Sequence, residues 1–376
     1  MLAVSPLSGE VPLTRFTVMP DNSSNAPALD ADLRPEAEEV ARAANLYYVC
    51  GDEPGYTRRP WGRGFTYLDA AGHHVKDAAL RQRFENLVIP PAWSDVWICA
   101  DPKGHIQATG RDAKGRKQYI YHPRWETERN ALKFSRMIPF GEALPALRQQ
   151  IDTDLRQHKL SREKVTALAV RLLEETLIRI GNEEYAQRNH SYGLTTLQEK
   201  HLTLSGSHIR IEFTGKHGKQ QEVDVRDRRL ARQVARCHEL PGHELFSYLD
   251  ENDQVRPLTS TDVNAYLREY TGCDFTAKDF RTWGATALAA SILREMPEVE
   301  EPEARQKQVV EMVKQVAEAL GNTPAVCRQY YIHPAVTEAY LAGTLREETA
   351  VTTPVEGLSE AETAVLQFLR TQEQNM

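Results

Sequence analysis

The chain has 376 residues, which is more than one compact core usually holds, so two domains are expected. Its formal net charge of -7 at pH 7 disfavours a protein that coats nucleic acid through bulk positive charge, although a local basic face can still bind it. The five cysteines are widely spaced and form no CxxC pair, which indicates neither a zinc site nor a disulfide framework and fits a reducing cytoplasm. No basic start with a following apolar run, and no membrane-spanning apolar stretch, is found, so a cytoplasmic protein without membrane association is expected.

The N-terminal third is predicted to hold a flexible lead-in followed by a small sheet-rich domain. Residues 1–34 contain a stretch rich in Pro, Asn and Ser, and the run from Pro35 to Glu39 then opens a helix. Between about Tyr56 and Trp125, short alternating runs such as 96–99 and 118–121 are broken by Gly and Pro turns, as in a sheet. We assign residues 35–130 to this domain.

Helical spacing dominates from about Ala131, so residues 131–350 are predicted to form a larger, mainly helical domain. Two apolar faces carry this prediction, and they consist of Leu144, Leu147, Ile151 and Leu155, and of Val165, Leu168, Leu172 and Leu173. One β-hairpin interrupts the helices: Ile209, Ile211 and Phe213 alternate with polar residues, Val223 and Val225 do the same, and Lys216 lies in the turn between them. The fold class is therefore α+β.

Two capping boxes mark later helices. Thr276 with Asp279 begins one of them and places Arg281 in its first turns. Ser359 with Glu362 begins a short amphipathic helix in the tail, residues 351–376, which we expect to pack on the rest of the protein.

Between these two helices, a tight corner precedes a pair of tyrosines. Gly321 suits the residue after a helix end, Thr323 suits an N-cap, and Pro324 suits the first helical position. Pro334 disfavours a helical conformation at the residue before it, so the new helix is short. Tyr331 is thus expected near an interrupted helix end, projecting away from a packed face; the alternative is that it is a core or interface aromatic residue.

A tyrosine can attack phosphorus only if nearby positive charge favours the phenolate, because its pKa is ~10. Arg179 and Arg281 are the candidate cations, since guanidinium groups match phosphate oxygens and stay charged. For Arg179 the alternative is a salt bridge with Glu174 or Glu175, and for Arg281 it is a solvated helix charge. Lys216 could protonate an alkoxide leaving group, or its turn could simply be a polar turn.

In this order, the segments resemble the type IB DNA topoisomerases, in particular the small poxvirus-like forms of bacteria. The matching motifs are Arg179-Ile180-Gly181, the hairpin lysine, the run from Lys278 to Arg281, and a Leu-Gly-x-Thr corner at a fixed distance from Tyr331. The resemblance implies that Tyr331 forms a 3′-phosphotyrosyl bond, that both arginines stabilise the transition state, and that Lys216 is the general acid.

Two further features come from the same resemblance. Lys278 is implied to act near the leaving oxygen. Asn322 stands where the viral and nuclear enzymes have histidine; its amide can donate a hydrogen bond but cannot exchange a proton near neutrality, so oxyanion support is its expected role.

A basic strand in the first domain resembles the family's DNA-contacting strand. Its candidate phosphate and base contacts are Arg111, Lys114, Arg116, Lys117, Gln118, Tyr119 and Tyr121. Tyr185 matches another family contact with DNA. The alternative is an exposed basic turn that leads into a half-buried strand.

The expected activity is relaxation of supercoiled duplex DNA by a monomer that closes on the DNA as a two-domain clamp, without ATP, metal or other cofactor. One alternative is a tyrosine recombinase, which usually has histidine where this chain has Lys278 and lacks the sheet domain. The other is a DNA-binding protein without catalysis, in which Arg179, Lys216 and Arg281 are plain phosphate contacts.

Overall fold

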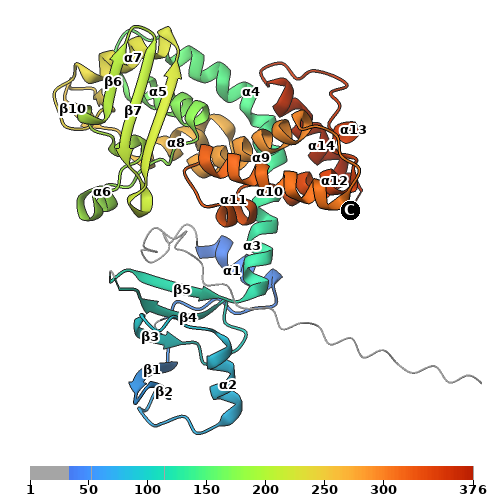
Figure 1. The fold of residues 1–376 in the computed structure, drawn as a ribbon. Helices are drawn as coiled ribbons and strands as arrows, with labels where there is room; N and C mark the ends of the chain where they lie inside the picture. The colour runs from blue at the N-terminus through green and yellow to red at the C-terminus, as the bar shows by residue number, and fades with distance from the viewer. Residues whose placement is uncertain (1–33, 52, 114, 376) are drawn as a thin grey trace, which may run out of the picture. The chain divides into compact units, whose positions relative to one another are not determined.

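The computed structural model describes residues 34–51, 53–113 and 115–375, so the predicted lead-in lies almost entirely outside the described residues. The chain divides into two compact units, Met1–Lys133 and Phe134–Met376. The first is built on an antiparallel sheet and the second is mostly helical, which confirms the predicted α+β class (Figure 1).

The sheet of the first unit has five strands in the order β2-β1-β3-β4-β5, all antiparallel. The strands are β1 (Tyr56–Trp61), β2 (Gly64–Leu68), β3 (Ser94–Ile98), β4 (Ile106–Arg111) and β5 (Lys117–Tyr121). Among the described residues of this unit, three helices accompany them, α1 (Arg34–Ala43), α2 (Ala78–Asn86) and α3 (Pro123–Ser135), and the last of these continues into the second unit. The helix that we predicted from Pro35 is thus present as α1.

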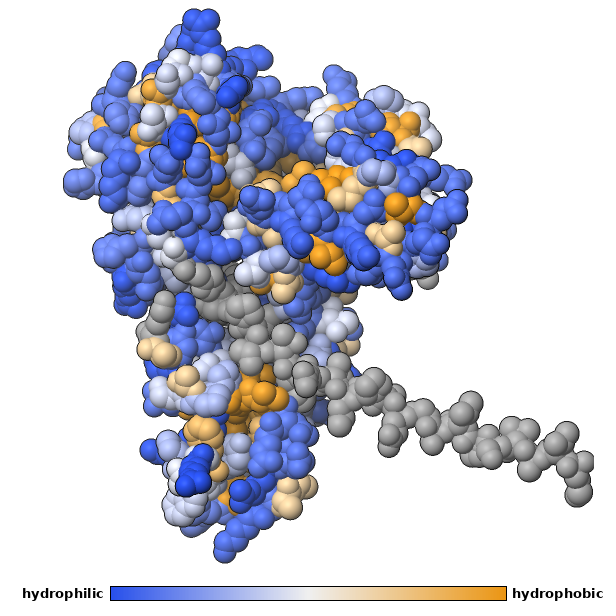
Figure 2. Space-filling model, viewed as in Figure 1, coloured by the Kyte–Doolittle hydropathy of each residue, from blue (hydrophilic) through white to orange (hydrophobic). Residues whose placement is uncertain are grey.

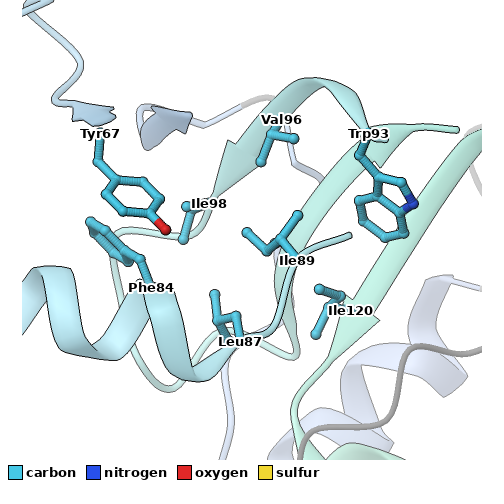
Figure 3. Close-up of a cluster of buried hydrophobic side chains, with 9 residues drawn as sticks. Tyr67, Phe84, Leu87, Ile89, Trp93, Val96, Ile98 and Ile120 are labelled. Atoms are coloured by element: carbon cyan, nitrogen blue, oxygen red, sulfur yellow. The ribbon is translucent and has the colours of Figure 1, made fainter. Parts of the chain in front are cut away.

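Helix α2 covers one face of this sheet and closes its core. Phe84 of α2 is fully buried and its ring lies 5.0 Å from that of Tyr67 in β2. Figure 3 shows these rings beside Ile98, with Trp93 and Ile120 farther along the same cluster. The alternation seen in the sequence therefore reflects a sheet with one packed apolar face.

A second, smaller core lies where α1 and α3 meet the end of β5. Trp125 at the start of α3 packs with Ala41 and Leu46 from the segment around α1, and Tyr121 packs against the same group. The apolar positions of α1 face this core, which explains why the helix forms at this point of the chain.

The second unit contains the remaining helices and two small sheets. Its α-helices are α4 (Met137–Asp154), α5 (Arg162–Thr176), α6 (Glu183–Asn189), α7 (Arg228–His238), α8 (Ser260–Thr271), α9 (Ala277–Glu295), α10 (Pro302–Ala319), α11 (Pro324–Tyr330), α12 (Pro334–Ala342), α13 (Leu345–Glu348) and α14 (Glu360–Gln374). Helix α9 is central, because α4, α5, α10, α12 and α14 all contact it. Most of its residues are accordingly buried.

The predicted hairpin belongs to a three-stranded antiparallel sheet in the order β6-β7-β8. Its strands are β6 (Leu202–Ser205), β7 (His208–Thr214) and β8 (Gln220–Arg226), and a short second sheet pairs β9 (Ser247–Leu249) with β10 (Val255–Pro257). The apolar residues of β7 are buried while their neighbours are exposed, as the alternation predicted. A turn of 3-10 helix, Lys216–Gly218, joins β7 to β8 and carries Lys216, as expected.

The C-terminal helix α14 packs on α4 and α9. Ser359 and Glu362 form the predicted capping box at its start. The Glu362 carboxylate also accepts hydrogen bonds from Arg148 of α4 at 2.6 Å and from the indole N–H of Trp283 of α9 at 3.1 Å. The tail therefore braces the central helix, as the prediction of a packed amphipathic helix requires.

The face drawn in Figure 2 is mainly hydrophilic, with hydrophobic residues in small groups. Across the part of the chain that the structure describes, none of the helices is both long enough and apolar enough to span a bilayer.

Candidate active site

The corner before Tyr331 forms as predicted. Helix α10 ends where Gly321 takes a φ of +62°, a conformation that favours glycine. Thr323 caps α11 by accepting from the N–H of Val326 at 3.4 Å, and Pro324 is the first helical residue. Helix α11 then stops at Tyr330, and Tyr331 is the residue that caps its C-terminal end. Local sequence thus fixes where the tyrosine lies along the chain.

The side chain of Tyr331 is only 2% exposed, so the expectation that it projects away from a packed face is wrong. It lies instead beneath Arg281, whose guanidinium carbon is 5.1 Å from the centroid of the phenol ring. Tyr331, the residue after the short helix α11, thus lies against α9 rather than in solvent. A buried phenol next to a guanidinium is shielded from water, and the electrostatic interaction between the two groups is strong for that reason.

Arg281 is also buried, at 4% exposure, which makes the alternative of a solvated helix charge wrong. Its guanidinium donates to the carbonyl of Leu177 and, at 3.0 Å, to the carbonyl of Leu320. Its Nε is buried and has no hydrogen-bond partner among the described residues. A buried charged donor without a partner is costly, so this nitrogen indicates a place where an anion would bind.

Arg179 lies in the loop after α5, which begins at Leu177 in a left-handed conformation with φ 52°. Its Nη2 donates to the side-chain oxygen of Asn322 at 2.5 Å. Glu174 is paired with Arg148 at 2.7 Å and with Arg171 at 3.0 Å. Within the described ranges Arg179 has no ion pair, so the predicted alternative of a structural salt bridge is wrong.

Asn322 is oriented by this contact. Because its side-chain oxygen accepts from Arg179, its amide nitrogen is the end left to donate. That nitrogen is buried without a nitrogen or oxygen partner among the residues described, and its neighbour is the thiol of Cys327, a weak acceptor. Two unpartnered donors, one from Arg281 and one from Asn322, therefore belong to the same group of side chains. This is the arrangement that a non-bridging phosphate oxygen would complete.

The surrounding cations change the acidity of Tyr331. Burial by itself raises the pKa of a phenol. The positive charges of Arg281 and Arg179 outweigh this effect, and they are helped by Lys278 and by a hydrogen bond from Arg281. The net result is that the pKa of Tyr331 falls from 10.0 to about 7. A phenol with this pKa is partly ionised near neutrality, and groups with such shifted pKa values cluster at functional sites.

We predict that Tyr331 ionises near pH 7 and that its ionisation stabilises the fold. In the unfolded chain the phenol keeps its ordinary pKa of ~10, so between pH 7 and 10 the unfolded state binds more protons. The free energy of unfolding should therefore rise with pH in this window, by up to about 4 kcal/mol. This increment is fully present above pH 10 and is lost as the pH falls to 7.

The measurement is the difference between wild type and Tyr331→Phe, which cancels the other titrating groups. Tyrosinate absorbance should show one phenol ionising near pH 7 in the wild type only, and urea unfolding should show the growing stability difference. Identical titrations in the two proteins would contradict the prediction.

Thr286 was missed by the sequence analysis, yet it holds the backbone of the tyrosine. It is fully buried in α9, and its hydroxyl oxygen lies 3.1 Å from the carbonyl oxygen of Tyr331 and 3.1 Å from the backbone nitrogen of His333. The hydroxyl accepts from that N–H, and donates to the Tyr331 carbonyl or to the carbonyl of Thr282 at 2.9 Å. A threonine among the small and apolar residues of α9 gave no sequence signal for this role.

Thr286→Val is predicted to lower the free energy of unfolding by about 1–3 kcal/mol, because it keeps the shape of the side chain but leaves backbone groups of residues 331 and 333 without partners. Urea unfolding measures the change. Thr282→Val is the matched control, since among the described residues that buried hydroxyl makes only a long 3.4 Å contact with the carbonyl of Lys278, and its loss should cost less. Equal effects of the two substitutions would contradict the role given to Thr286.

Lys216 and Lys278 lie on two different elements, the hairpin turn and the start of α9. Lys216 is half-buried in the turn between β7 and β8. Lys278 is exposed in the first turn of α9 and contributes to the lowered pKa of Tyr331. In the hairpin turn, Lys219 donates to the carbonyl of Asn322 at 2.8 Å, which brings the turn to the corner. Lys219 is a second residue that the sequence analysis did not single out.

The predicted DNA-contact residues of the first unit form a network of their own. Arg116 pairs with Asp112 at 2.6 Å, and the amide of Gln118 donates to the same carboxylate at 3.2 Å. The rings of Tyr119 and Tyr121 stack with centroids 5.8 Å apart. Asp112 thus neutralises part of the local positive charge, and contact of this strand with DNA stays a prediction.

The remaining predicted contacts are more scattered. Arg111 lies 3.7 Å from Asp95 and donates to the carbonyl of Gly115, and Lys117 lies over the ring of Tyr119 at 5.6 Å. Tyr185 is half-buried in α6. Lys114 lies outside the described residues. Among the residues that the structure does describe, no group of three or more His, Cys, Asp or Glu side chains is placed to hold a metal ion.

Two family models match the chain. One, described as eukaryotic DNA topoisomerase I, catalytic core, matches residues 117–351. The other, described as bacterial DNA topoisomerase IB, N-terminal domain, matches residues 64–112. Between them the two matches take in the sheet of the first unit from β2 onward and the helical unit through Tyr331.

Two viral proteins agree with these matches. DNA topoisomerase 1B of Acanthamoeba polyphaga mimivirus is 32% identical over 266 residues, which are 69% of this chain and 79% of that protein. DNA topoisomerase 1B of Vaccinia virus (strain Copenhagen) is 26% identical over 233 residues, 61% of this chain and 70% of that protein. Among solved structures, the post-cleavage complex of the XerH site-specific recombinase has a TM-score of 0.35 and 16% identity, covering 54% of this chain and 51% of that chain. The catalytic-core match over most of the chain and the extensive similarity to the viral proteins show that this protein belongs to the type IB DNA topoisomerases.

Proposed function

We propose that Tyr331 is the nucleophile with which this topoisomerase opens one strand of duplex DNA. The phenolate oxygen attacks phosphorus, so that a phosphorus–oxygen bond to Tyr331 forms while the bond to the 5′-oxygen breaks. The 5′-oxygen takes a proton from the ammonium group of Lys216 and leaves as a hydroxyl. In religation the hydroxyl attacks the phosphotyrosine, the phenolate leaves, and Lys216 recovers the proton.

The observation that carries this proposal is the buried phenol covered by Arg281, beside two buried donors that lack partners. The Arg281 Nε and the Asn322 amide are both without hydrogen-bond partners in the described parts of the chain. A phosphate at this point would supply acceptors for both donors and negative charge for both guanidinium groups. Because negative charge grows on the non-bridging oxygens in the transition state, these donors stabilise it more than the ground state.

Asn322 is proposed to support an oxyanion without proton exchange. Its side-chain oxygen is engaged by Arg179, which fixes the amide with its nitrogen toward the phosphate site. An amide donates in one direction only and does not titrate near neutrality. The site therefore needs Lys216, rather than Asn322, as its proton donor.

The reaction should proceed without a nucleotide or a divalent metal. The phosphotyrosine ester is close in energy to the phosphodiester that it replaces, so religation needs no second energy source. The guanidinium groups take the charge-neutralising role that Mg²⁺ has in many other phosphoryl-transfer enzymes. Superhelical stress in the substrate drives rotation of the free 5′ end.

We propose further that the chain acts in the cytoplasm as a monomer and closes on duplex DNA as a clamp. The basic strand pair of the first unit, with Arg111, Lys117 and Tyr121, would supply phosphate and base contacts. These contacts are supported by residue type and by the match to the bacterial N-terminal domain. Membership of the family makes relaxation of DNA, rather than recombination, the activity of this chain.

The test is to trap the covalent intermediate on a labelled duplex in EDTA and without nucleotide. Denaturing the reaction with detergent should leave protein attached to the strand that carries a 5′-end label, because a 3′-phosphotyrosyl bond retains that part of the strand. A 3′-end label on the same strand should be released. Attachment to the 3′-labelled fragment, or relaxation of plasmid that requires added metal, would contradict the proposal.

A further inference from the structure

The turn that carries Lys216 contacts the corner that precedes Tyr331. Lys219 lies in the same turn, and its ammonium nitrogen donates to the backbone carbonyl of Asn322 at 2.8 Å. The side chain of that asparagine accepts from Arg179 at 2.5 Å. Asn322 is therefore held at its side chain by Arg179 and at its backbone carbonyl by the hairpin turn.

The same hairpin makes a second contact with the corner. The side chain of Gln221 in β8 lies so close to Gly321 that a Cβ atom at this glycine would be 2.0 Å from the Gln221 Oε1. The neighbouring carbonyl of Leu320 accepts from Arg281 at 3.0 Å. In the corner, Leu320 thus contacts Arg281 of α9, Gly321 contacts β8, and Asn322 contacts the hairpin turn.

The hairpin turn is closed, so its two lysines move together. The N–H of Gly215 donates to the carbonyl of Lys219 at 2.7 Å, and the N–H of Gly218 donates to the carbonyl of Gly215 at 3.1 Å. Lys219 itself is exposed and, within the described ranges, lies in no ion pair. A contact that holds Lys219 therefore also holds Lys216.

We propose that Lys219 is a positioning residue for the general acid: its ammonium group fastens the hairpin turn to the carbonyl of Asn322, which keeps Lys216 at the leaving 5′-oxygen. This inference rests on the proposed function, in which Lys216 protonates that oxygen. Without the contact, the closed turn swings away from the corner as a unit. Protonation of the leaving group then becomes slow, while attack by Tyr331 is unchanged.

A sulfur atom in place of the bridging 5′-oxygen separates these two steps. An alkoxide leaving group needs a proton as the bond breaks, because the pKa of its alcohol is near that of water at ~16. A thiol has a pKa of ~8.5, so a thiolate leaves without a proton. A residue that serves only the general acid is needed for the oxygen substrate and dispensable for the sulfur substrate.

The experiment measures single-turnover cleavage of two duplexes, one with the natural bridging 5′-oxygen and one with sulfur in its place. The wild-type protein is compared with Lys219→Met, which keeps the approximate length of the side chain but removes the hydrogen-bond donor. We expect Lys219→Met to cleave the oxygen substrate about 5–20-fold more slowly, the effect of losing one charge-assisted hydrogen bond. On the sulfur substrate the loss should be less than about twofold. Lys219→Arg keeps a charged donor and should recover most of the rate.

Two further variants keep the outcomes distinguishable. Lys216→Ala should show a larger defect that sulfur also suppresses; if sulfur does not suppress it, the proposed general acid is wrong, and the inference falls with it. If Lys216→Ala is suppressed but Lys219→Met is equally slow on both substrates, or as fast as wild type on both, the positioning role is overturned. Lys314→Met is the matched control, because this exposed lysine of α10 contacts only Glu311 at 3.4 Å among the described residues, and it should cleave both substrates normally.

Discussion

Replacing Tyr331 with phenylalanine is expected to abolish strand cleavage and plasmid relaxation. The substitution removes one oxygen atom and leaves the ring in place beneath Arg281, so the loss reports the missing nucleophile rather than a changed fold. Removing the attacking atom of a covalent enzyme typically costs at least about 10⁴-fold in rate. Plasmid relaxation followed over time, together with detergent trapping of the covalent complex, measures this loss.

The control is Tyr330→Phe, because Tyr330 is the adjacent tyrosine and is also buried. Tyr330 ends α11, whereas Tyr331 lies under the Arg281 guanidinium and has its pKa lowered by Arg281 and Arg179, so Tyr330→Phe should still cleave and relax DNA. Folding of both variants is compared by urea unfolding below pH 7, where the Tyr331 phenol is protonated and its charge contributes nothing. Cleavage that survives in Tyr331→Phe and disappears in Tyr330→Phe would reverse the assignment.

Arg281→Ala is expected to reduce the rate of cleavage by about 10³–10⁵-fold, the range seen when an arginine that neutralises charge in phosphoryl transfer is removed. Arg281 is expected to contribute twice, because it lowers the pKa of Tyr331 and because its buried Nε, which has no hydrogen-bond partner among the described residues, would be available to donate to a phosphate oxygen. Arg281→Lys should recover only a small part of the rate, since an ammonium group cannot reproduce the planar fork of donors. Single-turnover cleavage measures both variants.

The rate effect has to be separated from a folding effect. Arg281 donates to the carbonyls of Leu177 and Leu320, so Arg281→Ala should also lower the free energy of unfolding by about 1–3 kcal/mol for each buried carbonyl left without a donor. Arg294→Ala, in the same helix and paired with Glu360 at 3.5 Å, should change neither rate nor stability by much. A rate loss that merely follows the fraction of unfolded protein would contradict the catalytic role.

Local patterns predicted several elements of this protein correctly. The corner at Gly321, Thr323 and Pro324 was predictable because a left-handed glycine, an N-cap and a first-position proline are satisfied by neighbouring backbone groups. The hairpin around Lys216 was predictable for a similar reason, since its alternation has the period of a strand with one buried face. Each of these features depends on residues close together in the chain.

The partners of the charged residues were not predictable in this way. Glu174 was a reasonable partner for Arg179 by distance along the chain, yet it pairs with Arg148 of α4 and with Arg171. Arg179 instead contacts Asn322, which is far away in the sequence. The burial of Tyr331 was missed for the same reason, because the groups that cover it come from α9 and from the loop after α5.

The sequence by itself determined the family of this protein, the order of its elements, and the residue types that phosphoryl transfer requires, because these follow from spacing and local backbone preference. Only the tertiary structure decided that Tyr331 is buried, that Thr286 and Lys219 hold the surrounding backbone, and that the Arg281 Nε and the Asn322 amide lack partners in the described part of the chain. Packing of α9 against α5 and α10, with the short helix α11 packed on α10, brings these groups together. Charge and burial depend on every neighbour in space, so no pattern along the chain could have specified them.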